Sequence, residues 1–253
     1  MTNCVVLSTQ RSGSTFLVDY LSSAPGILIH SELFQNLRPD LLDRPNAPRH
    51  YAIAYQTYRK SSLPRKLAHR FRRAGLIEKY LEDIYAPKLN IDVIGIKFMY
   101  NQARKYPEVL TWLQAHDVFF IHLVRENLLD MIVSRELATK RGTYSMLKPL
   151  DAVQIQVDVG RLTTEMESIA NEIAHFRKVC STLRSHELTY EALVGDTAGA
   201  VQAILGRLNV SDRQPLGSRL QKTNTTPLKN VIANYSEVAA SLGQHPQFSR
   251  FLA

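Results

Sequence analysis

A short polar segment near the N-terminus has the residue types and the spacing that bind an anionic group. Residues 11–17 read Arg-Ser-Gly-Ser-Thr-Phe-Leu and follow the apolar run 4–7, which predicts a buried strand leading into a helix. A tight turn between a strand and a helix directs the free N–H groups of the first helical turn, and the positive end of the helix dipole, at one position. Hydroxyl groups and the Arg11 guanidinium add donors suited to phosphate or sulfate. An ordinary turn capped by Ser14 is the structural alternative.

A second polar position follows the most apolar segment of the chain. Residues 118–124 predict a buried strand, and Arg125 comes directly after it. In an open α/β sheet, ligands bind beyond the carboxyl ends of the strands, so the charge of a ligand is expected beside Arg125. A helix predicted over 127–139 places Ser134 two to three turns further along. The alternative for Arg125 is an ion pair with one of two neighbouring carboxylates, those of Glu126 and Asp130.

The elements that position these residues alternate between strand-like and helix-like segments, which is the pattern of a parallel sheet with crossover helices. Further strands are predicted over 27–30, 93–98 and 187–190, and further helices over 101–115 and 151–180. Residues 35–90 are polar and punctuated by prolines, which favours a helical insert or lid that binds an acceptor. We therefore predict a single α/β domain over residues 1–253, long enough to bury a full core.

Composition predicts a soluble cytoplasmic enzyme. No window has the length of a membrane span, and the N-terminus lacks the pattern of a signal peptide. Cys4 and Cys180 stand among apolar residues, which predicts reduced core thiols, and no Cys or His spacing typical of a metal site occurs. The 31 Lys and Arg residues exceed the 23 Asp and Glu residues, a net charge of +8 that predicts anionic partners.

Much of this excess charge lies in one basic stretch, residues 59–73. The simplest interpretation is a solvated basic helix, and the alternative is a surface that docks an anionic acceptor or membrane headgroups. Leu63, Leu67 and Phe71 recur at fourfold spacing, so we expect one side of this helix to pack against another surface.

The loop at residues 11–15 differs from the Walker A motif, because Gly-x-x-x-x-Gly-Lys-Ser/Thr is absent. It resembles the 5′-phosphosulfate loop of the sulfotransferases that use 3′-phosphoadenosine 5′-phosphosulfate (PAPS). The resemblance implies a P-loop-type, three-layer α/β/α fold with a central, mainly parallel sheet. It also implies that the donor is bound by Arg11, Ser12, Gly13, Ser14, Thr15 and Phe16.

Three later segments carry the same resemblance. Arg125 and Ser134 resemble the family's 3′-phosphate motif, and their offset of nine residues is similar to the bacterial carbohydrate branch. Tyr190 resembles a tyrosine near the adenine, with core packing as the alternative. Lys222 is implied as a further cation for the 3′-phosphate, with an exposed loop lysine as the alternative.

The catalytic base is expected after the strand at 27–30, where polar side chains emerge at the sheet edge beside the phosphosulfate loop. This segment resembles the Glu-x-Phe segment of bacterial glycan and glycolipid sulfotransferases, which implies Glu32 as the general base and His30 as the second candidate. Arg11 would stabilise the leaving charge. A structural ion pair of Glu32 with Arg11 or another cation is the alternative. Two further possibilities are Lys97 and His122, of which His122 is expected to be a hydrogen-bonded core residue.

The resemblance implies a PAPS-dependent, metal-free sulfotransferase of the bacterial type. The implied acceptor is a sugar hydroxyl of a glycolipid, lipopolysaccharide or oligosaccharide, with peripheral contact to an anionic membrane surface and no nucleic-acid partner. One alternative is a nucleotide-dependent kinase, which is disfavoured because no Walker Lys-Ser/Thr is present and no Asp clearly ends a strand to hold Mg²⁺. The other is a basic module that binds nucleic acid or acidic membranes through residues 59–73.

Overall fold

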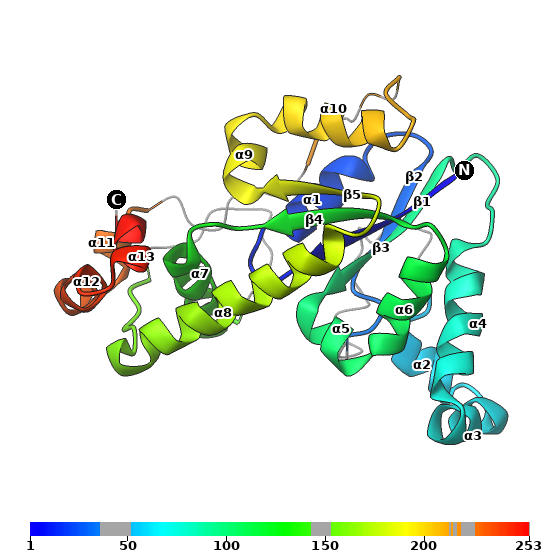
Figure 1. Ribbon diagram of the computed structural model, residues 1–253, viewed down its shortest axis with the longest axis horizontal. Coiled ribbons are helices and arrows are strands. Elements are labelled where there is room, and N and C mark those ends of the chain that lie inside the picture. The colour runs from blue at the N-terminus through cyan, green and yellow to red at the C-terminus, as the bar shows by residue number, and fades with distance from the viewer. Residues whose placement is uncertain (36–51, 143–152, 213, 215–216, 219–225, 253) are drawn as a thin grey trace.

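Five parallel strands form one sheet at the centre of the molecule (Figure 1). The computed structural model describes residues 1–35, 52–142, 153–212, 214, 217–218 and 226–252. The strands are β1 (Thr2–Ser8), β2 (Ile27–His30), β3 (Val93–Met99), β4 (Phe119–Val124) and β5 (Ser185–Thr189), in the spatial order β2-β3-β1-β4-β5. Every residue of β3 and β4 is buried, as expected for parallel strands that are covered on both faces.

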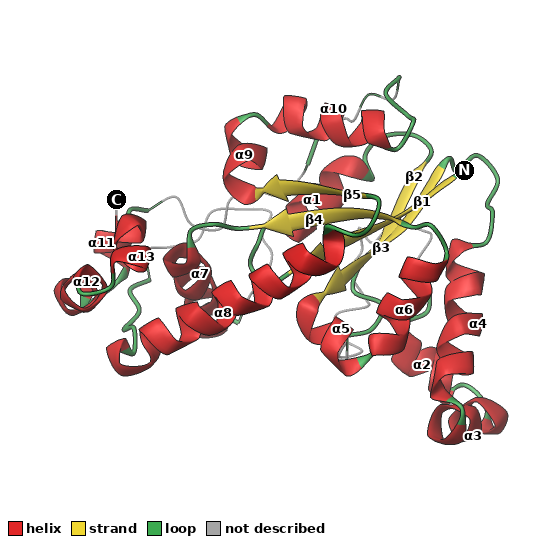
Figure 2. Ribbon diagram, in the orientation of Figure 1, coloured by secondary structure: helices red, strands yellow, loops and turns green. Residues whose placement is uncertain are grey.

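Helices cover the two faces of this sheet (Figure 2). In chain order they are α1 (Ser14–Leu21), α2 (Tyr55–Lys60), α3 (Leu63–Phe71), α4 (Arg73–Tyr85), α5 (Tyr100–Lys105), α6 (Pro107–Ala115), α7 (Leu128–Arg141), α8 (Val159–Cys180), α9 (Tyr190–Gly195), α10 (Thr197–Arg207), α11 (Leu228–Val231), α12 (Tyr235–Gly243) and α13 (Pro246–Ser249), followed by a 3₁₀ turn at Arg250–Leu252. Within the described ranges, we find no helix that combines the length and the apolar character needed to cross a membrane.

Alternate residues of β1 contribute to two separate cores, one on each face of the sheet. Val5 and Leu7 pack with residues of α4 to α8, whereas Cys4 and Val6 pack with residues of α1 and α10. This alternation is what a central strand with helices on both sides requires. The predicted three-layer α/β/α fold with a parallel sheet is therefore confirmed.

The carboxyl ends of β1 and β4 form the topological switch point of the sheet. The two strands are adjacent and parallel, with Ser8 opposite Leu123. After β1 the chain enters α1, which packs on one face, and after β4 it enters α7, which packs on the other. Because the two connections leave in opposite directions, a crevice opens between them, and ligands of open α/β sheets bind in such a crevice.

Two helix predictions were wrong in their extent. The helix expected over 101–115 is divided into α5 and α6 at Pro107, because proline lacks an N–H group and disfavours the helical conformation of the residue before it. The long helix expected from residue 151 begins at Val159. The backbone of Ile155 instead forms an isolated parallel bridge with Ile232, so it cannot form helical hydrogen bonds.

The segment predicted as a helical insert forms α2, α3 and α4 over its described part. Only α4 contributes a continuous buried face, which includes Ile77, Leu81 and Tyr85. The first part of the segment, residues 36–51, lies outside the described residues. The helices of this segment therefore differ in role, since α4 belongs to the core and α3 does not.

Candidate active site

The loop after β1 adopts the conformation needed to present the N-terminus of α1. Arg11 and Gly13 both have positive φ angles, 63° and 87°, and α1 starts at Ser14. The fully buried Ser12 hydroxyl donates a hydrogen bond to the carbonyl oxygen of Thr9 at 2.9 Å, which closes the turn. Ser12 thus stabilises the loop through its side chain, while Thr15 is exposed on the first turn of α1. The first-turn amides of α1 are aimed at the switch point.

Gly13 is required at its position both by its backbone angle and by a close neighbour. A Cβ atom added there would lie 2.5 Å from Cδ2 of Tyr190 and 2.8 Å from its Cε2. The Tyr190 ring in turn lies under the Arg125 guanidinium, whose Cζ is 4.4 Å from the ring centroid. Tyr190 therefore packs the phosphosulfate-type loop against the strand-end arginine, and the structure brings these three predicted residues together.

We predict that Gly13→Ala destabilises the protein far more than Gly142→Ala. Both glycines have positive φ, but no described residue lies within 4 Å of a Cβ added at Gly142. Gly142→Ala should lower the free energy of unfolding only by the cost of holding alanine in the left-handed conformation, about 1–2 kcal/mol. Gly13→Ala carries the same cost and also forces the Tyr190 ring away. Urea unfolding of the two variants measures the difference. Equal losses would show that the contact with Tyr190 is unimportant.

Arg11, Arg125 and Ser134 meet at the switch point. The Arg11 Nε donates to the Ser134 hydroxyl at 3.0 Å, and Nη1 of Arg125 donates to the Arg11 carbonyl oxygen at 3.3 Å. Arg125 is only 7% exposed, and within the described ranges its Nε has no hydrogen-bond partner. A buried guanidinium with an unused donor is the arrangement that an anionic ligand completes.

Carboxylates hold this arginine and its turn in place. Nη2 of Arg125 is paired with Asp130 at 2.7 Å, so the ion pair weighed as an alternative is formed. The Glu191 carboxylate accepts hydrogen bonds from the backbone N–H groups of Glu126 and Asn127 at 3.1–3.2 Å. Sequence reasoning did not single out Glu191, although its position beside Tyr190 in the same short segment was a usable signal.

Glu32 is connected to the first turn of α1 by a lysine that contacts both. Its Oε1 is 2.8 Å from Nζ of Lys97, which also donates to the Thr15 hydroxyl at 2.9 Å. Its Oε2 accepts from the Gln102 side chain at 3.1 Å. Lys97 is 3% exposed, so a buried cation joins the predicted base to the predicted donor loop. The ion pair considered as the alternative for Glu32 is thus formed with Lys97, and Gln102 is a partner that sequence reasoning missed.

The two histidines differ in environment. His30 is buried at the end of β2, two residues before Glu32. His122 is fully buried in β4, where its Nε2 lies 2.5 Å from the Tyr100 hydroxyl and its Nδ1 lies 3.1 Å from Glu187. Burial lowers the pKa of His122 below its usual value even though Glu187 opposes this effect. The prediction that His122 is a hydrogen-bonded core residue is confirmed.

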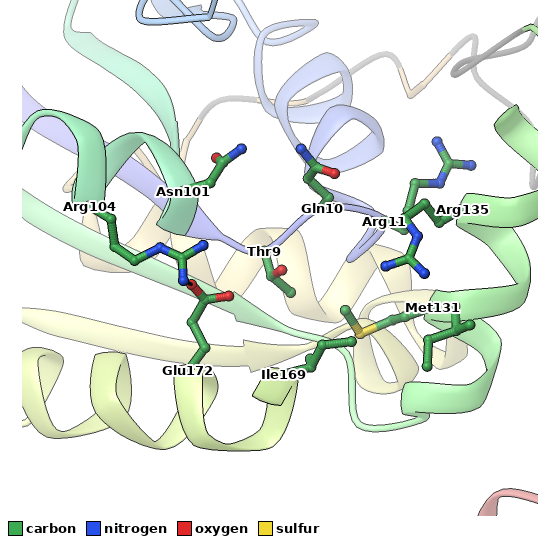
Figure 3. A pocket seen from close by; sticks show the side chains of 10 residues that line it. Thr9, Gln10, Arg11, Asn101, Arg104, Met131, Arg135, Ile169 and Glu172 are labelled. Carbon is green, nitrogen blue, oxygen red and sulfur yellow. Dashed lines mark ion pairs between the residues drawn. The ribbon is translucent and has the colours of Figure 1, made fainter. Parts of the chain in front are cut away.

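A cavity of about 260 Å³ adjoins the loop after β1 (Figure 3). Thr9, Gln10 and Arg11 line it from the loop, while α5, α7 and α8 supply the other walls. Two arginines of the lining are paired with carboxylates, Arg104 with Glu172 at 3.1 Å and Arg135 with Glu165. Most of the lining residues are therefore polar, and the charges of these two arginines are neutralised by carboxylates.

Three other predictions can be placed only in part. Phe16 is half-buried and packs against the core that α1 and α10 share. Lys222 lies outside the described residues. Within the part of the chain that is described, no three His, Cys, Asp or Glu side chains are grouped so that they could hold a metal ion.

One family of known proteins matches this chain over most of its length. A solved sulfotransferase from Alicyclobacillus acidocaldarius aligns over 100% of this chain and 96% of its own, with 10% identity and a TM-score of 0.48. No curated protein sequence matches the chain. The family model described as "Sulfotransferase family" matches residues 4–214, which include the donor loop, Glu32, Arg125, Ser134 and Tyr190. The chain therefore belongs to the sulfotransferase family.

Proposed function

We propose that this sulfotransferase takes its sulfuryl group from PAPS and transfers it to a hydroxyl group of a sugar acceptor. The observation that carries the proposal is the convergence of Arg11, Arg125 and Ser134 at the switch point, directly beside the N-terminus of α1. Two separated anionic groups, a 5′-phosphosulfate and a 3′-phosphate, need two separate sets of donors. The loop with α1 would serve the first, and Arg125 with Ser134 the second.

The described residues fit this donor. The Nε of Arg125 is a buried donor without a protein partner among the described residues, and the remaining atoms of the guanidinium are fixed by Asp130 and by the Arg11 carbonyl oxygen. Tyr190 presents a ring beside the loop, where an adenine could stack. These features support an adenosine nucleotide with an additional phosphate rather than a simple phosphate ion.

Sulfuryl transfer needs three things from this chain. PAPS, when bound, supplies a sulfuryl group on a phosphate leaving group. Glu32 would remove the proton from the acceptor hydroxyl while the oxygen of that hydroxyl forms the new bond to sulfur. Arg11 and the first-turn amides of α1 would stabilise the negative charge left on the phosphate oxygen. Lys97, held between Glu32 and Thr15, would keep the base and the donor loop in register.

We place the acceptor in the cavity beside Arg11, whose lining residue Asn101 precedes Gln102, the hydrogen-bond partner of Glu32. Its amide side chains, Gln10 and Asn101, can each donate and accept hydrogen bonds, as the hydroxyl groups of a sugar require. Its volume of about 260 Å³ suits a sugar residue rather than a long apolar chain. A sugar of an oligosaccharide, lipopolysaccharide or glycolipid is thus the acceptor class that we propose.

Calorimetric titration with 3′,5′-adenosine bisphosphate (PAP) tests the donor. We expect PAP to bind at least about tenfold more tightly than 5′-AMP, because the 3′-phosphate gains charged hydrogen bonds. ADP and ATP with Mg²⁺ are the comparators. Binding of ATP without binding of PAP would replace this proposal with the kinase alternative. In that case, incubation with labelled PAPS and sugar acceptors would yield no labelled sugar.

A further inference from the structure

Helix α3 carries an apolar stripe on the side that faces away from the protein. Leu63, Leu67 and Phe71 are 68%, 50% and 74% exposed, respectively. They lie at fourfold spacing and so occupy one side of the helix. The sequence led us to expect this side to pack against another surface, but no described residue of the protein buries it. A contiguous apolar stripe of this kind on a surface marks an interaction site.

The opposite side of α3 attaches the helix to the protein. The His69 Nδ1 lies 3.0 Å from the Tyr55 hydroxyl, and Ala68 packs against the main core. The Arg65 guanidinium lies 4.1 Å from the centroid of the Tyr58 ring. The orientation of α3 is therefore fixed by α2, and the apolar stripe is presented outward.

Cations border the stripe. Lys66 and Arg70 are exposed on the same outward side, one turn apart, and the exposed Arg72 follows at the end of the helix. The segment 55–71, which includes α2 and α3, contains neither Asp nor Glu. The surface therefore combines exposed apolar side chains with uncompensated positive charge.

We propose that α3 docks this protein on an anionic lipid bilayer, lying in the plane of the interface. A bilayer surface matches both features at once, since acyl chains receive the apolar stripe and anionic headgroups pair with the cations. A second protein copy would bring the same positive charge to the contact, which disfavours self-association. Figure 1 shows α3 at an extremity of the molecule, beyond the end of α4, where a flat surface can reach it. The proposal does not depend on the identity of the donor or the acceptor.

Vesicle flotation of the full chain tests this proposal without any activity measurement. We expect binding to vesicles of phosphatidylcholine mixed with phosphatidylglycerol, and little binding to phosphatidylcholine alone. The combined change Leu63→Ser, Leu67→Ser and Phe71→Ser should reduce the bound fraction at least about tenfold. Lys66→Gln with Arg70→Gln should reduce it by a similar factor and weaken its dependence on salt.

Matched variants elsewhere on the surface provide the controls. Leu89 is 91% exposed outside α3, so Leu89→Ser should leave vesicle binding unchanged. Arg161→Gln with Lys178→Gln removes two exposed cations from α8 and should also have little effect. Equal binding by the α3 variants and the wild type would overturn the proposal. So would a dimer, seen by sedimentation without vesicles, that the apolar α3 variant abolishes.

Discussion

Glu32→Gln is expected to reduce turnover by about 10²–10⁴-fold while PAP binds nearly as before. The substitution keeps the shape of the side chain and removes its ability to take a proton from the acceptor hydroxyl. Saturating-rate kinetics with labelled PAPS, combined with calorimetric titration of PAP, measure the two effects separately. A purely structural role of Glu32 predicts the opposite division, in which binding and stability fall and the rate per bound donor is retained.

The ion pair with Lys97 makes a matched control necessary. Lys97 is 3% exposed, so removing its carboxylate partner costs stability even where no chemistry is lost. Glu108 forms a pair with Arg73 at 2.6 Å, and its side chain is 22% exposed against 19% for Glu32, but Arg73 is 41% exposed whereas Lys97 is 3% exposed. Glu108→Gln should therefore destabilise the protein less than Glu32→Gln does, without a large change in turnover. Turnover of Glu32→Gln within about tenfold of the wild type would contradict the assignment of the base.

The strand–turn–helix conformation around residues 11–15 could be predicted from sequence because its information is local. A strand, the Arg-Ser-Gly-Ser-Thr turn and a helix are contiguous, and the single glycine marks the turn where φ is positive. The same holds for Arg125, which follows an unbroken apolar strand. The Arg-Ser-Gly-Ser-Thr turn and Arg125 both lie at the switch point because parallel strands end at the same edge of the sheet.

The partners of Glu32 could not be predicted in the same way. Lys97 comes from β3 and Gln102 from α5, and they meet Glu32 only because β3 lies beside β2 in the sheet. Strand order is a property of the tertiary fold and leaves no local pattern. The contact between Gly13 and Tyr190 has the same origin, since 177 residues separate them in the chain.

Helix α3 shows a different limit of sequence patterns. Apolar residues at fourfold spacing predict an amphipathic helix, and α3 is one. The pattern cannot distinguish a side buried in the protein's own core from a side left for a partner. Only the exposed fractions of Leu63, Leu67 and Phe71 make that distinction.

Arg125→Ala is expected to weaken PAP binding by about 10–100-fold and to change 5′-AMP binding much less. If Arg125 and Ser134 hold the 3′-phosphate, only a ligand that carries this phosphate loses the contact. Arg11→Ala should instead weaken both nucleotides, because Arg11 belongs to the loop that faces the 5′ end. Calorimetric titration of PAP and 5′-AMP into both variants gives, for each variant, the ratio of the two dissociation constants. A change in this ratio indicates a contact with the 3′-phosphate, and an unchanged ratio indicates a contact with the 5′ end.

The Arg125–Asp130 pair requires a control at the other edge of the sheet, because Arg125→Ala removes an ion pair as well as a ligand contact. Arg184, directly before β5, pairs with Asp117, two residues before β4, at the amino edge of the two strands whose carboxyl edge holds Arg125. Arg184→Ala should leave the affinities for both nucleotides unchanged. Equal weakening of PAP and 5′-AMP by Arg125→Ala would mean that the arginine serves only to fix the turn before α7. A selective loss of PAP would locate the 3′-phosphate at Arg125 and, with it, the direction in which the nucleotide crosses the sheet edge.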